Sequence, residues 1–162
     1  MFGFLTFGTT LTVADLALKN EIERQDDSTF PREMKGLRGW IKLYKNHNAG
    51  FSFGFLNGSR LVKMVPLCVF SGIAGAWTYI MGVRGRIVEK LALTLVLAGG
   101  ASNLLDRLVR GYVVDYFAIQ WKALKKVVFN LADIFIFLGS AILVAVQFVS
   151  GIQDWLREKK RT

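Results

Sequence analysis

Two aspartates, Asp115 and Asp133, have the residue type and setting for acid–base chemistry. Asp133 is the only charge in an apolar run from about 127 to 152, and a carboxylate at the centre of a membrane helix costs about 2.5 to 3.5 kcal/mol on insertion scales. Asp115 follows two valines in a short stretch after Gly111. Two neighbouring carboxylates cannot both ionise cheaply, so one keeps its proton while the other acts as a base. In aspartyl proteolysis the base activates water and the acid protonates the scissile carbonyl.

Both acids also have a purely structural interpretation. Asp133 could be the partner of a basic residue such as Arg107, and Asp115 could be an unrelated loop acid. Asn130 stands three residues before Asp133, where it could either orient the carboxylate or cap the N-terminus of a helix. The residues alone leave these alternatives open.

Small and polar residues recur at three- and four-residue spacing from Gly99 through Asn103 to Asp106 or Arg107. On a helix they form one stripe, which would face protein or substrate rather than lipid. Gly99 and its neighbour Gly100 favour close helix packing over direct substrate contact. The amide of Asn103 and the guanidinium of Arg107 suit a peptide carbonyl and a lipid ester or headgroup. Earlier in the chain, Asp15 and Lys19 have the spacing of a supporting intrahelical ion pair.

The elements that must position these residues are membrane helices. The chain has 162 residues, 52% of them hydrophobic, with a mean hydropathy of +0.37, which is too apolar for a soluble domain. Four runs are long enough to cross a bilayer. We therefore predict an all-α membrane protein, a four-transmembrane-helix bundle forming a single membrane domain over residues 1–162, with helices at about 1–21, 61–82, 87–109 and 127–152.

The segment from about 22 to 60 is predicted to be a small extracytoplasmic β-sheet lying on the membrane surface. It contains turn residues such as Pro31 and alternating stretches at 40–44 and 51–53. With four crossings, the connections after the first and third helices lie on the same side. The polar residues of the first helix, the third helix and the start of the fourth can therefore converge at one membrane face.

The formal net charge of +9 predicts contacts with anionic phospholipid headgroups rather than with nucleic acid, because the basic residues are interleaved with apolar spans. Basic residues at 84–90 and in the tail favour a cytoplasmic location for both termini. We expect no metal site, because His47 is the only histidine, and no organic cofactor.

Several motifs in order resemble the bacterial lipoprotein signal peptidase (signal peptidase II) family, over nearly the whole chain. They are Asp15-Leu16-Ala17-Leu18-Lys19, Asn48-Ala49-Gly50-Phe51-Ser52-Phe53, Gly99-Gly100-Ala101-Ser102-Asn103-Leu104-Leu105-Asp106-Arg107, Gly111-Tyr112-Val113-Val114-Asp115-Tyr116 and Phe129-Asn130-Leu131-Ala132-Asp133. Leu18 departs from the family pattern, which usually has threonine before the lysine of the first helix.

The resemblance implies a membrane aspartic endopeptidase that cleaves prolipoproteins before a diacylglyceryl-modified cysteine, at the extracytoplasmic face of the bacterial cell membrane. It implies that Asp115 and Asp133 are the catalytic pair. Further residues are implied to bind substrate, namely Asn48, Gly50, Asn103, Arg107 and Asn130, and others to give structural support, namely Asp15, Lys19, Gly99, Gly100, Asp106 and Ala132. Cyclic peptides of the globomycin type are implied inhibitors.

Two other classes of function remain to be weighed against the enzyme. One is an inactive relative or small membrane scaffold that keeps the polar stripes for packing, and retention of both aspartates with Asn103, Arg107 and Asn130 argues against it. The other is a proton or ion pathway, for which the chain offers no relay of ionisable residues towards the second membrane face.

Overall fold

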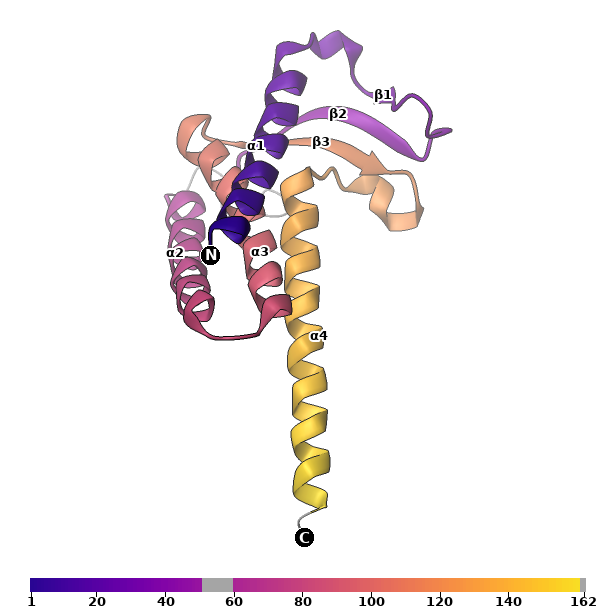
Figure 1. The fold of residues 1–162 in the computed structure, drawn as a ribbon. Coiled ribbons are helices and arrows are strands. Elements are labelled where there is room, and N and C mark those ends of the chain that lie inside the picture. The colour runs from indigo at the N-terminus through magenta and orange to yellow at the C-terminus, as the bar shows by residue number, and fades with distance from the viewer. Residues whose placement is uncertain (51–59, 161–162) are drawn as a thin grey trace.

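The computed structural model describes residues 1–50 and 60–160 and shows a helical protein with a small sheet at one end (Figure 1). The long helices are α1 (Phe2–Arg24), α2 (Leu61–Gly82), α3 (Ile87–Val109) and α4 (Leu131–Lys159). The strands are β1 (Arg32–Glu33), β2 (Ile41–Asn48) and β3 (Val113–Ile119), and two short 3₁₀ turns are η1 (Asp27–Thr29) and η3 (Lys122–Lys126). The prediction of a mostly helical protein with a small sheet is therefore confirmed.

Three helices of the described chain, α2, α3 and α4, are long and apolar enough to cross a membrane. The helix α1 is not among them, so three of the four predicted spans have the length and composition of membrane helices, and the prediction of four crossings stays a prediction. The polar residues of α1 explain the difference, because Asp15 and Lys19 lower its average hydropathy. Both side chains are fully buried against the rest of the protein.

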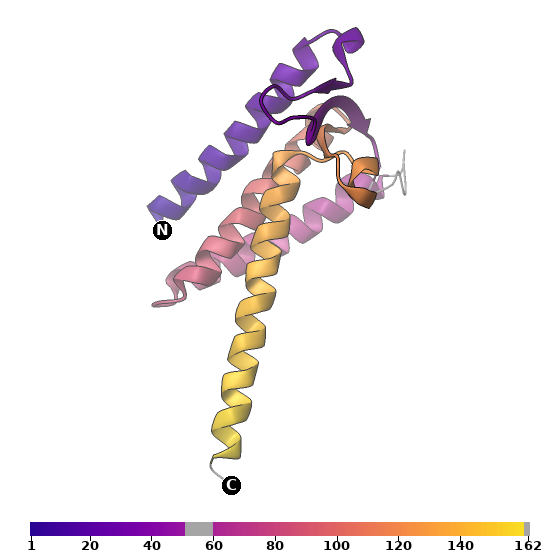
Figure 2. The ribbon, with the colours of Figure 1, turned by 90° about the vertical axis from the view of Figure 1, so that its right-hand side faces the viewer.

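The helix α3 lies at the centre of the fold, where it packs against α1, α2 and α4. Its buried side includes Ala92, Val96, Ala98 and Gly99, small residues that allow the neighbouring helix backbones to approach closely. Figures 1 and 2 show α4 continuing well past the turn between α2 and α3. At 29 residues, α4 is about 43 Å long, which exceeds the hydrocarbon thickness of about 30 Å.

The sheet is antiparallel in the order β1-β2-β3, so it joins the connection after α1 to the connection after α3. Asn46 pairs with Asp115 and Asn48 with Val113. The prediction that confined the sheet to 22–60 was wrong, because its third strand, β3, comes from beyond α3. The stretch expected at 40–44 lies in β2 apart from its first residue, and the one at 51–53 lies outside the described residues.

The helix α4 begins at Leu131 and ends at Lys159, instead of spanning 127–152. The chain before it is held in extended form, since the N–H of Phe129 donates to the carbonyl oxygen of Phe117 at 2.7 Å and Phe117 returns the bond at 3.0 Å. Asn130 then caps the helix. Asp133 therefore lies in the first turn of α4, nearer the helix end than a helix beginning at 127 would place it.

Gly99 marks the closest approach of α3 to α4. A Cβ placed there would collide with the carbonyl oxygen of Ala132 and would lie 2.8 Å from Cγ1 of Ile136. Gly100 is less constrained, since its Cβ would lie 3.3 Å from the ring of Phe70. The helix-packing interpretation of this glycine pair is supported for both residues.

Replacing Gly99 with alanine is expected to lower the free energy of unfolding by about 1 to 3 kcal/mol, because an added methyl group in a tight contact forces the backbone to move. Gly75→Ala is the matched control, since a Cβ at Gly75 of α2 meets nothing within 4 Å. Thermal unfolding of both variants in the same detergent tests the difference. Equal midpoints would show that the α3–α4 contact can relax at no cost.

Candidate functional site

A fully buried cation, Lys19 of α1, lies under the polar end of the bundle. Its Nζ is 2.8 Å from Oδ2 of Asp15 and 3.1 Å from Oδ2 of Asp106, and it donates to Oγ of Ser102 at 3.1 Å. Ser102 in turn donates to Asp15 at 2.6 Å. The predicted Asp15–Lys19 pair is therefore present as part of a larger buried cluster that joins α1 to α3, in which each charge has an opposite charge and hydrogen-bond partners.

The same lysine fixes the orientation of Asn103. Lys19 donates from Nζ to Oδ1 of Asn103 at 2.8 Å, so the amide nitrogen must point the other way. That nitrogen donates to Oδ1 of Asp133 at 2.9 Å. The buried cation thus ensures that Asn103 presents a donor, and not an acceptor, to the carboxylate.

Asn130 contacts both carboxylates. Its Oδ1 accepts from the backbone N–H of Asp133 at 2.9 Å, and its own backbone N–H donates to Oδ2 of Asp133 at 3.1 Å, which is a reciprocal capping box. Its Nδ2 donates to Oδ1 of Asp115 at 2.8 Å. The capping interpretation of Asn130 is therefore confirmed, whereas the carboxylate of Asp133 is bound by the backbone N–H of Asn130 and the side-chain amide nitrogen contacts Asp115 instead.

Asp115 reaches the site from β3, and only 4% of its surface is exposed. Asn48 of β2 donates from Nδ2 to Oδ2 of Asp115 at 3.3 Å. Burial, followed by the nearby charge of Asp133, raises the pKa of Asp115 to about 7, although the hydrogen bonds from Asn48 and Asn130 act in the opposite direction. Near neutral pH this carboxyl group can therefore hold or release a proton.

Arg107 of α3 lies beside the carboxylates and is bound through backbone oxygens. It donates to the carbonyl oxygen of Asn103 and to that of Gly50, each at 3.3 Å. Its Nε is buried and has no hydrogen-bond partner among the described residues. The ion-pair alternative for Asp133 is not supported, because Arg107 forms no salt bridge with it in the described part of the chain.

Each remaining candidate residue has a defined place around this site. The backbone N–H of Gly50 donates to Oδ1 of Asn48 at 3.2 Å. Asp106 accepts the backbone N–H of Val114 at 3.2 Å and forms an ion pair with Arg110, which ties the end of α3 to β3. Ala132 is fully buried against Gly99.

Tyr116 and Ser102 belong to the buried network but were not predicted from the sequence. The hydroxyl group of Tyr116 donates to Oδ1 of Asp15 at 3.0 Å and accepts the backbone N–H of Leu131 at 3.0 Å. Tyr116 therefore links α1 to the start of α4, and burial raises its pKa. The sequence did carry one signal for such residues, because a buried Asp15–Lys19 pair needs further hydrogen-bond partners.

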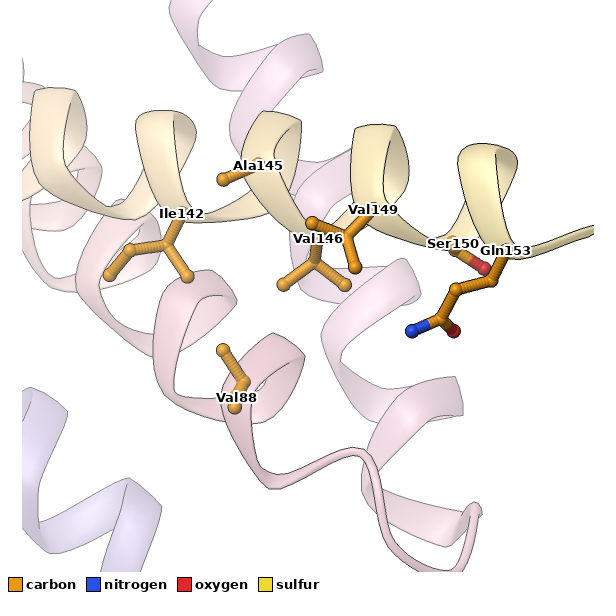
Figure 3. A pocket seen from close by; sticks show the side chains of 7 residues that line it. All are labelled: Val88, Ile142, Ala145, Val146, Val149, Ser150 and Gln153. Atoms are coloured by element: carbon orange, nitrogen blue, oxygen red, sulfur yellow. The ribbon is translucent and has the colours of Figure 1, made fainter. Parts of the chain in front are cut away.

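The described residues contain no group of three or more histidines, cysteines, aspartates or glutamates that could hold a metal ion. An apolar groove of about 500 Å³ lies elsewhere, between Val88 of α3 and the outer half of α4 (Figure 3). Its lining begins at Ile142 on α4, two turns or more beyond Asp133, so the groove is separate from the carboxylate site.

Comparison with known proteins identifies the fold and the family. The family model for signal peptidase (SPase) II matches residues 8–149. Two relatives named lipoprotein signal peptidase are those of Mesorhizobium japonicum, 28% identical over 91% of this chain and 86% of that protein, and of Brucella ovis, 30% identical over 76% and 74%.

Two solved structures of bacterial membrane enzymes, both obtained by the in meso method, have the same fold. One matches with a TM-score of 0.78 and 18% identity over 93% of this chain and 90% of that one. The other matches with a TM-score of 0.75 and 19% identity over 91% and 93%. Because the family model matches residues 8–149, which are most of this chain, the chain belongs to the signal peptidase II family of proteases.

Proposed function

We propose that this protein is a membrane aspartic endopeptidase that removes signal peptides from prolipoproteins by cleaving before a diacylglyceryl-modified cysteine, with Asp115 and Asp133 as the catalytic pair. The observation that carries the proposal is that one residue, Asn130, contacts both carboxylates, donating from its side-chain Nδ2 to Asp115 and from its backbone N–H to Asp133. Family membership and the name of the relatives supply the substrate class.

The two acids have different surroundings, which suggests their roles. Both carboxylates accept donors on both oxygens, but Asp133 also lies in the first turn of α4, where the N-terminal end of the helix favours an ionised carboxylate. Asp115, with a pKa raised to about 7, is suited to hold the shared proton. Asp133 then takes a proton from the attacking water, and Asp115 donates its proton to the carbonyl oxygen of the scissile bond.

Substrate is held by polar groups that surround the pair, in our proposal Asn48, Gly50, Asn103, Arg107 and Asn130. Arg107 is the strongest case, because its buried Nε has no partner among the described residues. A buried donor without an acceptor costs about 1 to 3 kcal/mol. A carbonyl oxygen of the substrate peptide or of its lipid ester would satisfy it.

The proposed membrane arrangement has four crossings in one domain, with α1 as the fourth. The two charges that lower its hydropathy are buried in the cluster with Asp106 and Ser102, so they need not contact lipid. Both termini are placed in the cytoplasm and the sheet outside the bacterial cell membrane. The proposed reaction needs no metal or organic cofactor, and membrane phospholipids and inhibitors of the globomycin type are the other proposed ligands.

Purified protein in detergent, incubated with a diacylglyceryl-modified prolipoprotein, should convert it to the shorter product on a gel. The same prolipoprotein without the lipid modification is the matched control and should remain uncleaved. A folded protein that cleaves neither form would contradict the proposed activity, and equal cleavage of both would contradict the lipid requirement.

The rate of cleavage should fall as the pH rises above about 7, because the raised pKa of Asp115 marks the loss of the proton that it donates. The hydrogen bond from Asn48 lowers that pKa, so Asn48→Ala should raise it and move the alkaline limb of kcat/KM to higher pH. Cleavage measured across the pH range tests this sign. A limb that stays in place or moves to lower pH would remove Asp115 from the role of acid.

A further inference from the structure

The end of the sheet farthest from α1 carries an unusual concentration of tryptophan and basic side chains. We call residues 34–42 and 119–127 the sheet tip. Within it Trp40 and Trp121 are 62% and 53% exposed. Its charged residues are all basic, namely Lys35, Arg38, Lys42, Lys122, Lys125 and Lys126. The sheet tip therefore has a formal charge of +6 and two large aromatic side chains open to their surroundings.

Backbone contacts hold these features together on one end of the sheet. The N–H of Gln120 donates to the carbonyl oxygen of Trp40 at 2.8 Å, so the segments that carry the two tryptophans are adjacent. The Nζ of Lys122 lies 5.1 Å from the ring centre of Trp121. Glu33 is the acid on the neighbouring strand, where it is the register partner of Lys42. The lysines of η3 form no salt bridge with an acid of the described chain.

The position of η3 relative to α4 sets its depth. Figures 1 and 2 both show this short turn, in orange, to one side of α4 and at the level of its first turns. Because α4 is a candidate membrane span that begins at Leu131, its first turns mark the boundary between hydrocarbon and headgroups. Every residue of η3 is exposed, including Leu124, so these side chains face outward at that boundary.

We propose that the sheet tip docks onto anionic phospholipid headgroups of the leaflet at the N-terminal end of α4. Tryptophan is enriched at this depth because its ring is apolar and its N–H can bond to headgroups or water. Lysines near an anionic membrane surface each strengthen association by about fivefold. The tryptophans and Leu124 enter the interface while the lysines of η3 bind phosphate.

An acidic protein partner would match the charge as well, but the geometry favours lipid. A protein partner would need a surface that extends outward from the membrane, whereas η3 lies level with the start of a membrane helix. Docking needs no cleavage, so it can be measured on inactive protein and its failure would leave the proposed peptidase untouched.

The test uses full-length protein in which Cys68, the only cysteine, is replaced by serine. A fluorophore is attached at Ala123→Cys in η3 or, as a matched control, at Ser28→Cys in η1, both exposed positions. The protein is reconstituted in vesicles of neutral phosphatidylcholine, or of phosphatidylcholine with phosphatidylglycerol, that contain spin-labelled quencher lipids. We expect severalfold stronger quenching at position 123 than at position 28, and a further increase with the anionic lipid.

Two sets of substitutions separate the contributions. Lys122→Gln, Lys125→Gln and Lys126→Gln together should remove the increase caused by anionic lipid, and Trp40→Ser with Trp121→Ser should lower quenching in both lipids. Equal quenching at positions 123 and 28 would overturn the docking. If quenching at position 123 is the same in neutral and anionic lipid, and does not change with the lysine substitutions, the recognition of anionic headgroups would be overturned.

Discussion

Replacing Asp133 with asparagine is expected to reduce prolipoprotein cleavage by about 10²- to 10⁴-fold or more, the usual contribution of a general base. The amide cannot take a proton from water, and the substitution removes the carboxylate that accepts from Asn103 and from the backbone of Asn130. The fold should lose about 1 kcal/mol, since an asparagine at this position can accept only one of the two N–H bonds that Asp133 accepts, and the cap of α4 is weakened.

Asp115→Asn should cause a loss of similar size for a different reason. The amide cannot transfer a proton to the carbonyl oxygen of the scissile bond, although it can still accept the bond from Asn130. Because the two carboxylates act as a unit, the double variant should be no slower than the slower single variant. Initial rates from the gel assay, measured at equal concentrations of folded protein, give all three comparisons.

Asp27→Asn is the matched control for both, since its carboxylate is 86% exposed and distant from the site. It should cleave at the rate of the unmodified protein. Folding of every variant is checked by thermal unfolding in the same detergent. Cleavage by folded Asp133→Asn at close to the normal rate would refute the catalytic pair.

Lys19→Met should be the most destabilising single substitution among those considered, at about 3 to 5 kcal/mol, because it leaves buried carboxylates without their cation. Methionine has nearly the same volume, so the loss comes from charge rather than from a cavity. The carboxylates of Asp15 and Asp106 would remain buried with only neutral donors on most of their oxygens. Asn103 would also lose one of the two donors to its amide oxygen, keeping only the bond from Asn130.

Arg157→Met is the control for loss of a charge in an exposed pair, because Arg157 and Asp154 are 74% and 67% exposed at 3.5 Å. Its unfolding midpoint should be almost unchanged. A small effect of Lys19→Met on the midpoint would mean that the carboxylates of the cluster take up protons or water and do not depend on the lysine.

The helices were the most predictable part of the fold, because an apolar run of about 20 residues has few possible structures other than a membrane helix. The errors lie at their ends and in the sheet. Residues Val127 to Phe129 are apolar and seemed to continue α4, yet they form its extended approach, and the capping box of Asn130 with Asp133 was the available boundary signal. The strand β3 was missed because nearly all of its residues are buried, so it has no alternation of polar and apolar positions.

The residues of the candidate site could be predicted from the sequence, but the hydrogen bonds between them could be seen only in the structure. Polar residues in apolar surroundings are conspicuous in any sequence, which is why Asn103, Asn130 and both aspartates could be named. The direction of the Asn103 amide could not be predicted, since it depends on Lys19, which reaches the site from another helix. Tyr116 was missed because a tyrosine in an apolar strand is usually a packing residue.

The hydrogen-bonded bridge between Phe117 and Phe129 closes the chain into a loop whose base lies next to both aspartates. Residues 118–128, which include η3, leave this base and return to it, so their path does not set the distance between Asp115 and Asp133. Doubling the length of a flexible loop costs only about 0.6 kcal/mol. Relatives can therefore differ in loop length here, and an epitope inserted after Ala123 should be tolerated, while the machinery that cleaves the substrate stays in register.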